Sequence, residues 1–223
     1  MSLPAHHLTV PRTARYFLLG EPDSADEIWF LLHGYGQLAA SFVRWFEPAA
    51  RPGRLLVAPE GLSRAYFEEQ GARRVGASWM TREDREAEMA DYVQYLDLLA
   101  DQLVGELPPT PPILVHGFSQ GTATACRWVS LGRHQVHRLV LWGGLVPPDL
   151  DLERLATRLR EAQFHLIIGE QDPYLGSEQI AAEQARLSGA GIEVSVHRFP
   201  GGHRIDLETL KELSRSSVGG ATT

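Results

Sequence analysis

The chain has 223 residues, of which 43% are hydrophobic and 22% charged, and its formal net charge is −7. This length and composition fit one compact globular domain, and the lack of a Lys/Arg run argues against a nucleic-acid or anionic-membrane surface. No apolar run approaches the ~20 residues of a membrane span, and the N-terminal segment does not resemble a secretory signal. The single cysteine, Cys126, excludes an intramolecular disulfide, so we expect a cytoplasmic protein.

Short apolar runs rich in Ile, Val, Leu and Phe predict strands. The earliest, within 8–20, predicts one or two antiparallel edge strands, because Pro11 cannot donate to a strand ladder. Several of the later runs are apolar on both faces, as in strands buried within a parallel sheet. The later runs are 27–34, 54–61, 112–119, 137–144, 164–172 and 192–200.

Helical patterns lie between these runs. The clearest covers 82–106, with Thr81 as the expected N-cap and apolar residues at three- and four-residue spacing on one face. Weaker helical patterns cover 38–50, 120–132, 151–161, 177–188 and 206–215. Alternation of strand and helix predicts an α/β fold, a mostly parallel sheet with helices on both faces. We expect one domain over 1–213 and a flexible C-terminal tail over 214–223.

A Gly-x-Ser-x-Gly motif lies between a predicted strand and a predicted helix, in "VHGFSQGTAT" at 115–124. Alone, this motif could be an ordinary turn. A sharp strand–turn–helix would expose the Ser119 hydroxyl and leave no room for side chains at Gly117 and Gly121. Free N–H groups of the following helix would also face the site. The context therefore predicts that Ser119 is a nucleophile.

A serine nucleophile needs a base and an orienting acid, which in this type of fold follow it in the order acid, then histidine. Asp172 comes just after a predicted strand and His203 lies in a glycine-flanked loop after the last one. Glu170 is an alternative acid, but Pro173 breaks the strand next to Asp172 and fixes a turn there. We therefore predict a triad of Ser119, Asp172 and His203.

The remaining candidate acids and bases have simpler explanations. Asp149 and Asp151 follow the preceding strand and are expected to form a turn and a helix N-cap. Three histidines within predicted strands are interpreted as packing or surface residues, and four others lack a site context: His116, His165 and His197, then His6, His7, His134 and His137.

Acyl transfer also needs hydrogen-bond donors for the oxyanion of the tetrahedral intermediate. The residue after the nucleophile supplies one backbone N–H, here Gln120. The loop after an early strand, "LLHGYGQ" at 31–37, should supply the second, which we assign to the Tyr35 N–H. His33 is expected to brace this loop. A glycine-rich turn without catalytic meaning is the alternative, but the two motifs occur in the expected order.

Together, "LLHGYG", "GFSQG", "GEQDP" and "GGH" resemble the α/β-hydrolase superfamily, and within it the phospholipase/carboxylesterase group that includes acyl-protein thioesterases. The resemblance spans roughly 27–210 and implies an α/β-hydrolase fold, the triad and oxyanion donors named above, and no cofactor. Three positions depart from the family pattern: Thr122 replaces a usual glycine, Trp79-Met80-Thr81 keeps only the tryptophan of a Trp-aromatic-Asp stretch, and Trp142-Gly143 replaces Ser-Gly.

The segment after Gly143 is too short for a large cap domain, so we expect an open cleft. The connection 61–80 is the best candidate for a partial wall. Its Tyr66, Phe67, Trp79 and Met80 are predicted to line an acyl-binding groove, although they could equally pin a long loop to the core. Trp142 is expected to narrow the acyl pocket.

These features predict a serine hydrolase acting on short- to medium-chain carboxylic esters or thioesters. The alternatives are a lysophospholipase, a peptidase or acyltransferase with the same triad, and a non-catalytic ligand-binding relative. We expect a small-molecule substrate, no nucleic-acid partner, no stable membrane insertion, and a monomer or homodimer. No motif for a metal site or a phosphate- or dinucleotide-binding loop stands out.

Overall fold

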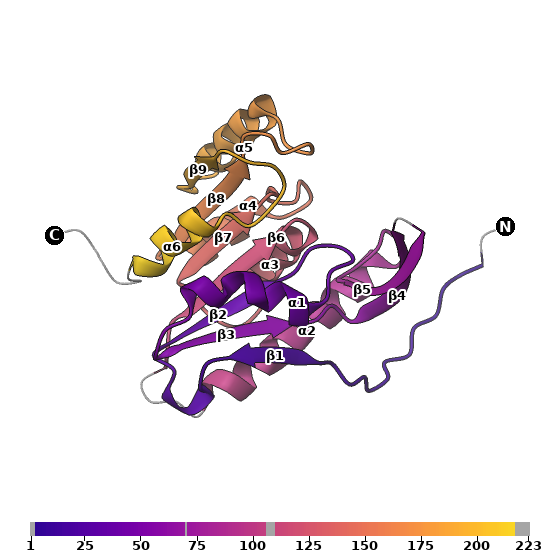
Figure 1. The fold of residues 1–223 in the computed structure, drawn as a ribbon. Coiled ribbons are helices and arrows are strands. Elements are labelled where there is room, and N and C mark those ends of the chain that lie inside the picture. Colours follow the sequence, from indigo (N-terminus) through magenta and orange to yellow (C-terminus); the bar gives the residue numbers. More distant parts are fainter. Residues whose placement is uncertain (1–2, 70, 106–109, 217–223) are drawn as a thin grey trace.

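The computed structural model describes residues 3–69, 71–105 and 110–216. Seven strands form one sheet in the order β1-β3-β2-β6-β7-β8-β9, and β4 and β5 form a separate hairpin (Figure 1). The main-sheet strands are β1 (Tyr16–Leu19), β2 (Glu27–Leu32), β3 (Arg54–Pro59), β6 (Ile113–Phe118), β7 (Arg138–Trp142), β8 (Gln163–Gly169) and β9 (Ser195–Phe199). The predicted α/β fold with a mostly parallel sheet is confirmed.

Strand β1 is the exception to the parallel arrangement. It pairs antiparallel with β3, with Tyr16 opposite Pro59, while β3, β2, β6, β7, β8 and β9 are all parallel. Its place at the sheet edge agrees with the antiparallel edge strand predicted within 8–20.

Helices cover both faces of the sheet (Figure 1). The helices are α1 (Ala39–Phe42), α2 (Arg85–Val104), α3 (Gln120–Leu131), α4 (Leu152–Leu159), α5 (Ser177–Gly189) and α6 (Leu207–Arg215), with the 3-10 helices η1 (Pro22–Ser24) and η2 (Val43–Ala49). None of the helices in the described part of the chain has the length and apolarity needed to span a bilayer.

Alternate residues of the buried strands serve two separate cores. In β2, Ile28, Phe30 and Leu32 pack with residues of α2, α3, α4 and α5. Trp29 and Leu31 of the same strand pack on the other side, with α1, η2 and α6. Burying one apolar side chain of this size stabilises the fold by roughly 1.5–3 kcal/mol. The strands are apolar on both faces because each face packs against a core.

The connection 61–80 is more regular than expected. It forms an antiparallel hairpin of β4 (Ser63–Glu69) and β5 (Ala72–Ser78), which projects beside α1 and α2 (Figure 1). The sequence does contain a signal for this hairpin, because two seven-residue runs are joined by Gln-Gly. Glycine readily adopts the positive φ of a tight hairpin turn.

The start of one helix and the start of the C-terminal tail also differ from the prediction. Helix α2 begins at Arg85 after Asp84, whose φ is 50°, so Thr81 is not its N-cap. Helix α6 runs to Arg215, and the carbonyl of Ser216 accepts a hydrogen bond from Arg138 at 3.0 Å. The first residues of the predicted tail therefore belong to the folded domain, and 217–223 lie outside the described residues.

Candidate active site

Ser119 occupies a sharp turn between β6 and α3. Its φ of 53° and ψ of −115° are unusual for a residue other than glycine. A Cβ on Gly117 would lie 2.4 Å from the Gly121 carbonyl oxygen, and one on Gly121 would lie 2.1 Å from the Leu32 oxygen. The turn therefore has the strained, close-packed geometry that exposes a nucleophile in this type of fold.

Asp172 and His203 form a hydrogen-bonded pair. The distance from Nδ1 of His203 to Oδ2 of Asp172 is 2.8 Å, and the side chains are 17% and 1% exposed, respectively. The other carboxylate oxygen, Oδ1, accepts from the Tyr174 N–H at 2.9 Å. Because the carboxylate accepts a hydrogen bond from the Nδ1–H group, the Nε2 atom of a neutral His203 is left as the basic nitrogen.

This pair lies at the same edge of the sheet as Ser119. The His203 ring centre is 4.8 Å from that of Phe118, the residue before Ser119. The Ser119 N–H donates to the Trp142 carbonyl at 2.9 Å, and a Cβ on the next residue, Gly143, would lie 2.8 Å from Nδ1 of His203. No hydrogen bond joins Ser119 to His203 within the described residues. Such bonds often tighten only when substrate is bound.

The loop that contains Tyr35 forms a tight turn against Ser119. The Gln37 N–H donates to the Gly34 carbonyl at 3.2 Å, and a Cβ on Gly34 would lie 3.2 Å from the Ser119 Cβ. Within residues 3–69, 71–105 and 110–216, the Tyr35 N–H has no hydrogen-bond partner. Gln120 is the first residue of α3, where backbone N–H groups lack intrahelical partners. Both predicted oxyanion donors are therefore available.

His33 braces this turn from beneath. Its Nδ1 donates to the Gly34 carbonyl at 2.8 Å, and its Nε2 accepts from the Gly61 N–H at 3.0 Å. Burial lowers the pKa of His33, so the ring is neutral near pH 7. Both nitrogens are used in holding the backbone, as expected from a bracing role.

The four residues predicted to line an acyl-binding groove, in the hairpin and just after it, have different surroundings. Tyr66 is exposed, and the half-buried Phe67 ring contacts the Tyr35 ring edge-on at 5.2 Å. Trp79 is buried, donating from Nε1 to the His33 carbonyl at 2.8 Å. Met80 is half-buried, and its carbonyl accepts from the side chain of Gln120 at 2.9 Å.

Trp142 does not face the site. Its side chain is fully buried in the core beneath α1, η2 and α6, where its Nε1 donates to Nδ1 of His116 at 3.2 Å. This placement corrects the expectation that Trp142 narrows an acyl pocket, because the alternation along β7 directs the side chain into the core.

Two exposed aromatic residues near the site were missed from the sequence. Tyr174 is 69% exposed and lies edge-on to His203 at 4.8 Å. Trp45 is 41% exposed and contacts Phe118 at 6.0 Å. The position of Tyr174, two residues after Asp172, was a usable signal. Trp45 lies within a stretch predicted only as a helix, and nothing in its spacing pointed to the site.

The competing acids have structural partners elsewhere. Asp151 caps α4 by accepting from the N–H groups of Glu153 and Arg154, as predicted. Asp149 pairs with Arg85 at 2.7 Å and with Arg127 at 3.1 Å.

Of the histidines interpreted as packing or surface residues, His116 is buried in the core, whereas His165 and His197 are half-buried. His165 and His197 bond to each other at 3.1 Å. Burial, together with the neighbouring His197, lowers the pKa of His165 to about 4. His116 is fully buried, and burial holds its pKa well below the usual value.

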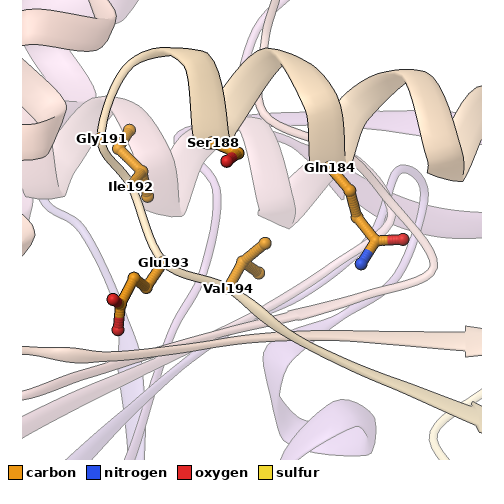
Figure 2. Close-up of a pocket in the computed structure, with 6 residues that line it drawn as sticks. All are labelled: Gln184, Ser188, Gly191, Ile192, Glu193 and Val194. Atoms are coloured by element: carbon orange, nitrogen blue, oxygen red, sulfur yellow. The ribbon is translucent and has the colours of Figure 1, made fainter.

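One surface hollow in the described part of the chain lies away from these residues. It has a volume of about 480 Å³ and lies between α5 and the segment that follows it, where Gln184 and Val194 face the space (Figure 2). None of its lining residues belongs to the predicted site. The strained Ser119 and the Asp172–His203 pair define the candidate site, since the chemistry would depend on these groups and not on the size of a hollow.

Comparison with known proteins agrees with the fold. The sequence matches the family model described as phospholipase/carboxylesterase over residues 20–217. The chain belongs to the phospholipase/carboxylesterase family. Membership of this family makes it an esterase-type hydrolase. A search of curated proteins gave no significant match.

Solved structures of the same fold include acyl-protein thioesterase 2 from Zea mays, with 16% identity, 91% of this chain and 97% of that chain covered, and a TM-score of 0.69. A carboxylesterase from Mesorhizobium loti is 24% identical over 90% of this chain and 93% of that chain, with a TM-score of 0.68. A Bacillus cereus carboxylesterase is 16% identical over 90% of this chain and 92% of that chain, with a TM-score of 0.62. At these identities the likeness establishes the fold of this hydrolase.

Proposed function

We propose that this hydrolase cleaves short- to medium-chain carboxylic esters or thioesters with Ser119, His203 and Asp172 as its catalytic triad. The observation that carries the proposal is the strained turn at Ser119 beside the Asp172–His203 pair, at one edge of the sheet. A serine held in a strained turn beside a mostly buried acid–histidine pair is the arrangement that nucleophilic catalysis by serine requires.

In the proposed reaction, Nε2 of His203 takes the hydroxyl proton as Ser119 attacks the acyl carbon. Asp172 holds Nδ1 protonated and stabilises the imidazolium that forms. The N–H groups of Tyr35 and Gln120 stabilise the oxyanion. His203 then gives its proton to the departing alcohol or thiol, and later activates the water that releases the acid.

The substrate range follows from the surroundings of Ser119. Between β7 and β8 the chain holds one helix, α4, so no inserted cap domain covers this edge. Exposed aromatic side chains at Tyr35 and Tyr174 offer limited apolar contact. An open, partly aromatic site favours short or medium acyl groups. The thioester option draws support from the plant thioesterase of the same fold.

The proposal is tested by turnover of matched p-nitrophenyl esters and acyl thioesters of increasing chain length. We expect Ser119→Ala to lower kcat at least about 10³-fold, because no other group replaces the nucleophile. Ser188→Ala, an exposed serine on α5, is the matched control and should keep parental turnover. Undiminished hydrolysis by Ser119→Ala would refute the assignment. Preferential cleavage of amides or lysophospholipids would show that the proposed substrate class is wrong and that the enzyme is a peptidase or a lysophospholipase.

A further inference from the structure

The end of β5 contacts both turns that carry the predicted oxyanion donors. The Gly36 N–H donates to the Ala77 carbonyl at 2.8 Å, and the Ala77 N–H donates to the Gln37 carbonyl at 3.1 Å. Two residues on, Trp79 donates from its indole to the His33 carbonyl. The turn around Tyr35 is therefore attached to the segment 77–80, the base of the hairpin.

The side chain of Gln120 attaches the other donor to the same segment. Its Nε2 donates to the Met80 carbonyl at 2.9 Å and to Oγ of Ser78 at 3.1 Å. Its Oε1 accepts from the Trp79 N–H at 3.1 Å. One amide thus makes these three bonds, and Oγ of Ser78 also lies 3.4 Å from its Oε1. Two of the three bonds go to backbone atoms, whose positions do not depend on a side-chain rotamer.

These bonds bear on catalysis because oxyanion donors act through their position. Donors must lie about 2.7–3.1 Å from the developing oxyanion, and a misplacement of about 1 Å can cost on the order of 10²-fold in rate. The backbone N–H of Gln120 lies on α3 and that of Tyr35 on a separate loop, so their spacing depends on whatever joins the two.

We propose that the side-chain amide of Gln120 is a positioning residue that fixes the spacing of the Tyr35 and Gln120 N–H groups through the segment 77–80. This inference rests on the proposed hydrolase function. It assigns the side chain a role separate from that of the Gln120 backbone N–H, which any residue except proline would supply.

The test uses Gln120→Met, which keeps the backbone N–H and a side chain of similar length but removes all three bonds. We expect kcat to fall roughly 10- to 100-fold while KM stays within about twofold, since the lost contacts matter most in the transition state. Gln179→Met is the matched control. Its amide accepts from the Gly176 N–H at 2.8 Å at the start of α5, and its loss should leave kcat unchanged.

A second variant distinguishes positioning from general packing. Gln120→Glu keeps an acceptor for the Trp79 N–H but presents a carboxylate to the Met80 carbonyl at neutral pH. Protonation restores an O–H donor to that carbonyl. The ratio of its kcat to that of the parent enzyme should therefore rise as the pH is lowered from 8 to 5. A packing role alone leaves this ratio flat, and a flat ratio counts against the proposal.

Amide hydrogen exchange supplies a readout that does not need turnover. In Gln120→Met, peptides covering 33–37 and 77–80 should exchange faster than in the parent or in Gln179→Met. Unchanged kcat in Gln120→Met overturns the proposal, as does unchanged exchange in both peptides. If the parent hydrolyses no ester or thioester, or if Ser119→Ala remains active, the proposed function is wrong, whatever the result for Gln120→Met. Exchange then still decides whether the amide holds the two turns.

Discussion

At Ser119, the backbone is held in a conformation that costs a non-glycine residue about 1–3 kcal/mol. Three bonds offset that cost. The Ser119 N–H donates to Trp142, and the Ser119 carbonyl accepts from both the N–H and the hydroxyl of Thr122, at 3.0 and 2.6 Å. At about 0.5–1.5 kcal/mol each, they suffice to hold the strain. Thr122, which departs from the family pattern, therefore helps to fix the turn.

Gly143 leaves no space for a side chain behind His203. Its φ is +60°, and a Cβ would lie 2.8 Å from both Nδ1 and Cε1 of His203. We predict that Gly143→Ala displaces the imidazole and lowers kcat by about 10²-fold or more. Steady-state kinetics beside a thermal melt checks this. Parental kcat in a folded Gly143→Ala protein would contradict the packing described here.

The positions of Ser119, Asp172 and His203 could be predicted because each follows a strand in a parallel sheet, and the carboxyl ends of such strands converge. The direction in which the Trp142 side chain points could not be predicted. Strand β7 is buried throughout, so the apolar pattern gives no sign of which residues face which core. The exposure of Tyr174 and Trp45 likewise depends on tertiary packing, which spacing along the chain does not record.

At the level of elements, strands and helices could be predicted where a periodic hydrophobic pattern extended over many residues, or where glycine or proline flanked an apolar run. Helix α2 shows the limit. Thr81 has the chemistry of an N-cap, but its N–H and hydroxyl both contact Glu88 and the helix begins later. A capping residue identifies a region in which a helix can start, and tertiary contacts select the position within it.

Helix α4 provides a test of capping energetics. Its N-cap, Asp151, accepts hydrogen bonds from two backbone N–H groups, at 3.0 and 3.1 Å. We predict that Asp151→Ala lowers the free energy of unfolding by about 1 kcal/mol. Urea denaturation measures the change. Asp91→Ala, on the exposed side of α2, should stay within about 0.5 kcal/mol of the parent. Equal losses in the two variants would count against the cap.

Over the whole molecule, the two cores hold the strands in register, and this register brings the candidate site together from β2, β6, β8 and β9. The same burial places neutral histidines inside the fold. Burial lowers the pKa of His33 and His116, and burial and His197 lower that of His165 to about 4. In the unfolded chain, each of these rings takes up a proton near pH 6.5.

The sign of the resulting pH dependence follows from proton linkage. Between about pH 6.5 and 4 the unfolded state binds more protons, so the stability is complete above pH 6.5 and falls as the pH drops through that window. Glu60 acts in a lower window. Burial raises its pKa, but hydrogen bonds from Arg15 and Arg64 outweigh burial and leave it lowered, so its contribution is lost only below about pH 4.5.

We therefore predict a loss of unfolding free energy between pH 6.5 and 4.5 that is smaller in His165→Gln than in the parent by roughly 1–2 kcal/mol. The neighbouring His197 and the positive charge of Arg138 also lower the pKa of His165, and both residues remain in the variant. Urea unfolding at several pH values measures the difference, with His6→Gln at the exposed N-terminal segment as the control. Identical pH profiles in parent and His165→Gln would contradict it.

The claim on which the account depends most is that Ser119 is an activated nucleophile. Reaction of the native protein with a fluorophosphonate, followed by peptide mass spectrometry, tests it directly. We predict one modification per chain, on the peptide that contains Ser119, with labelling slowed at least about 10²-fold in His203→Ala and abolished by prior denaturation. Modification at a different serine, or equally slow labelling of Ser119 in the native and denatured protein, would contradict the account.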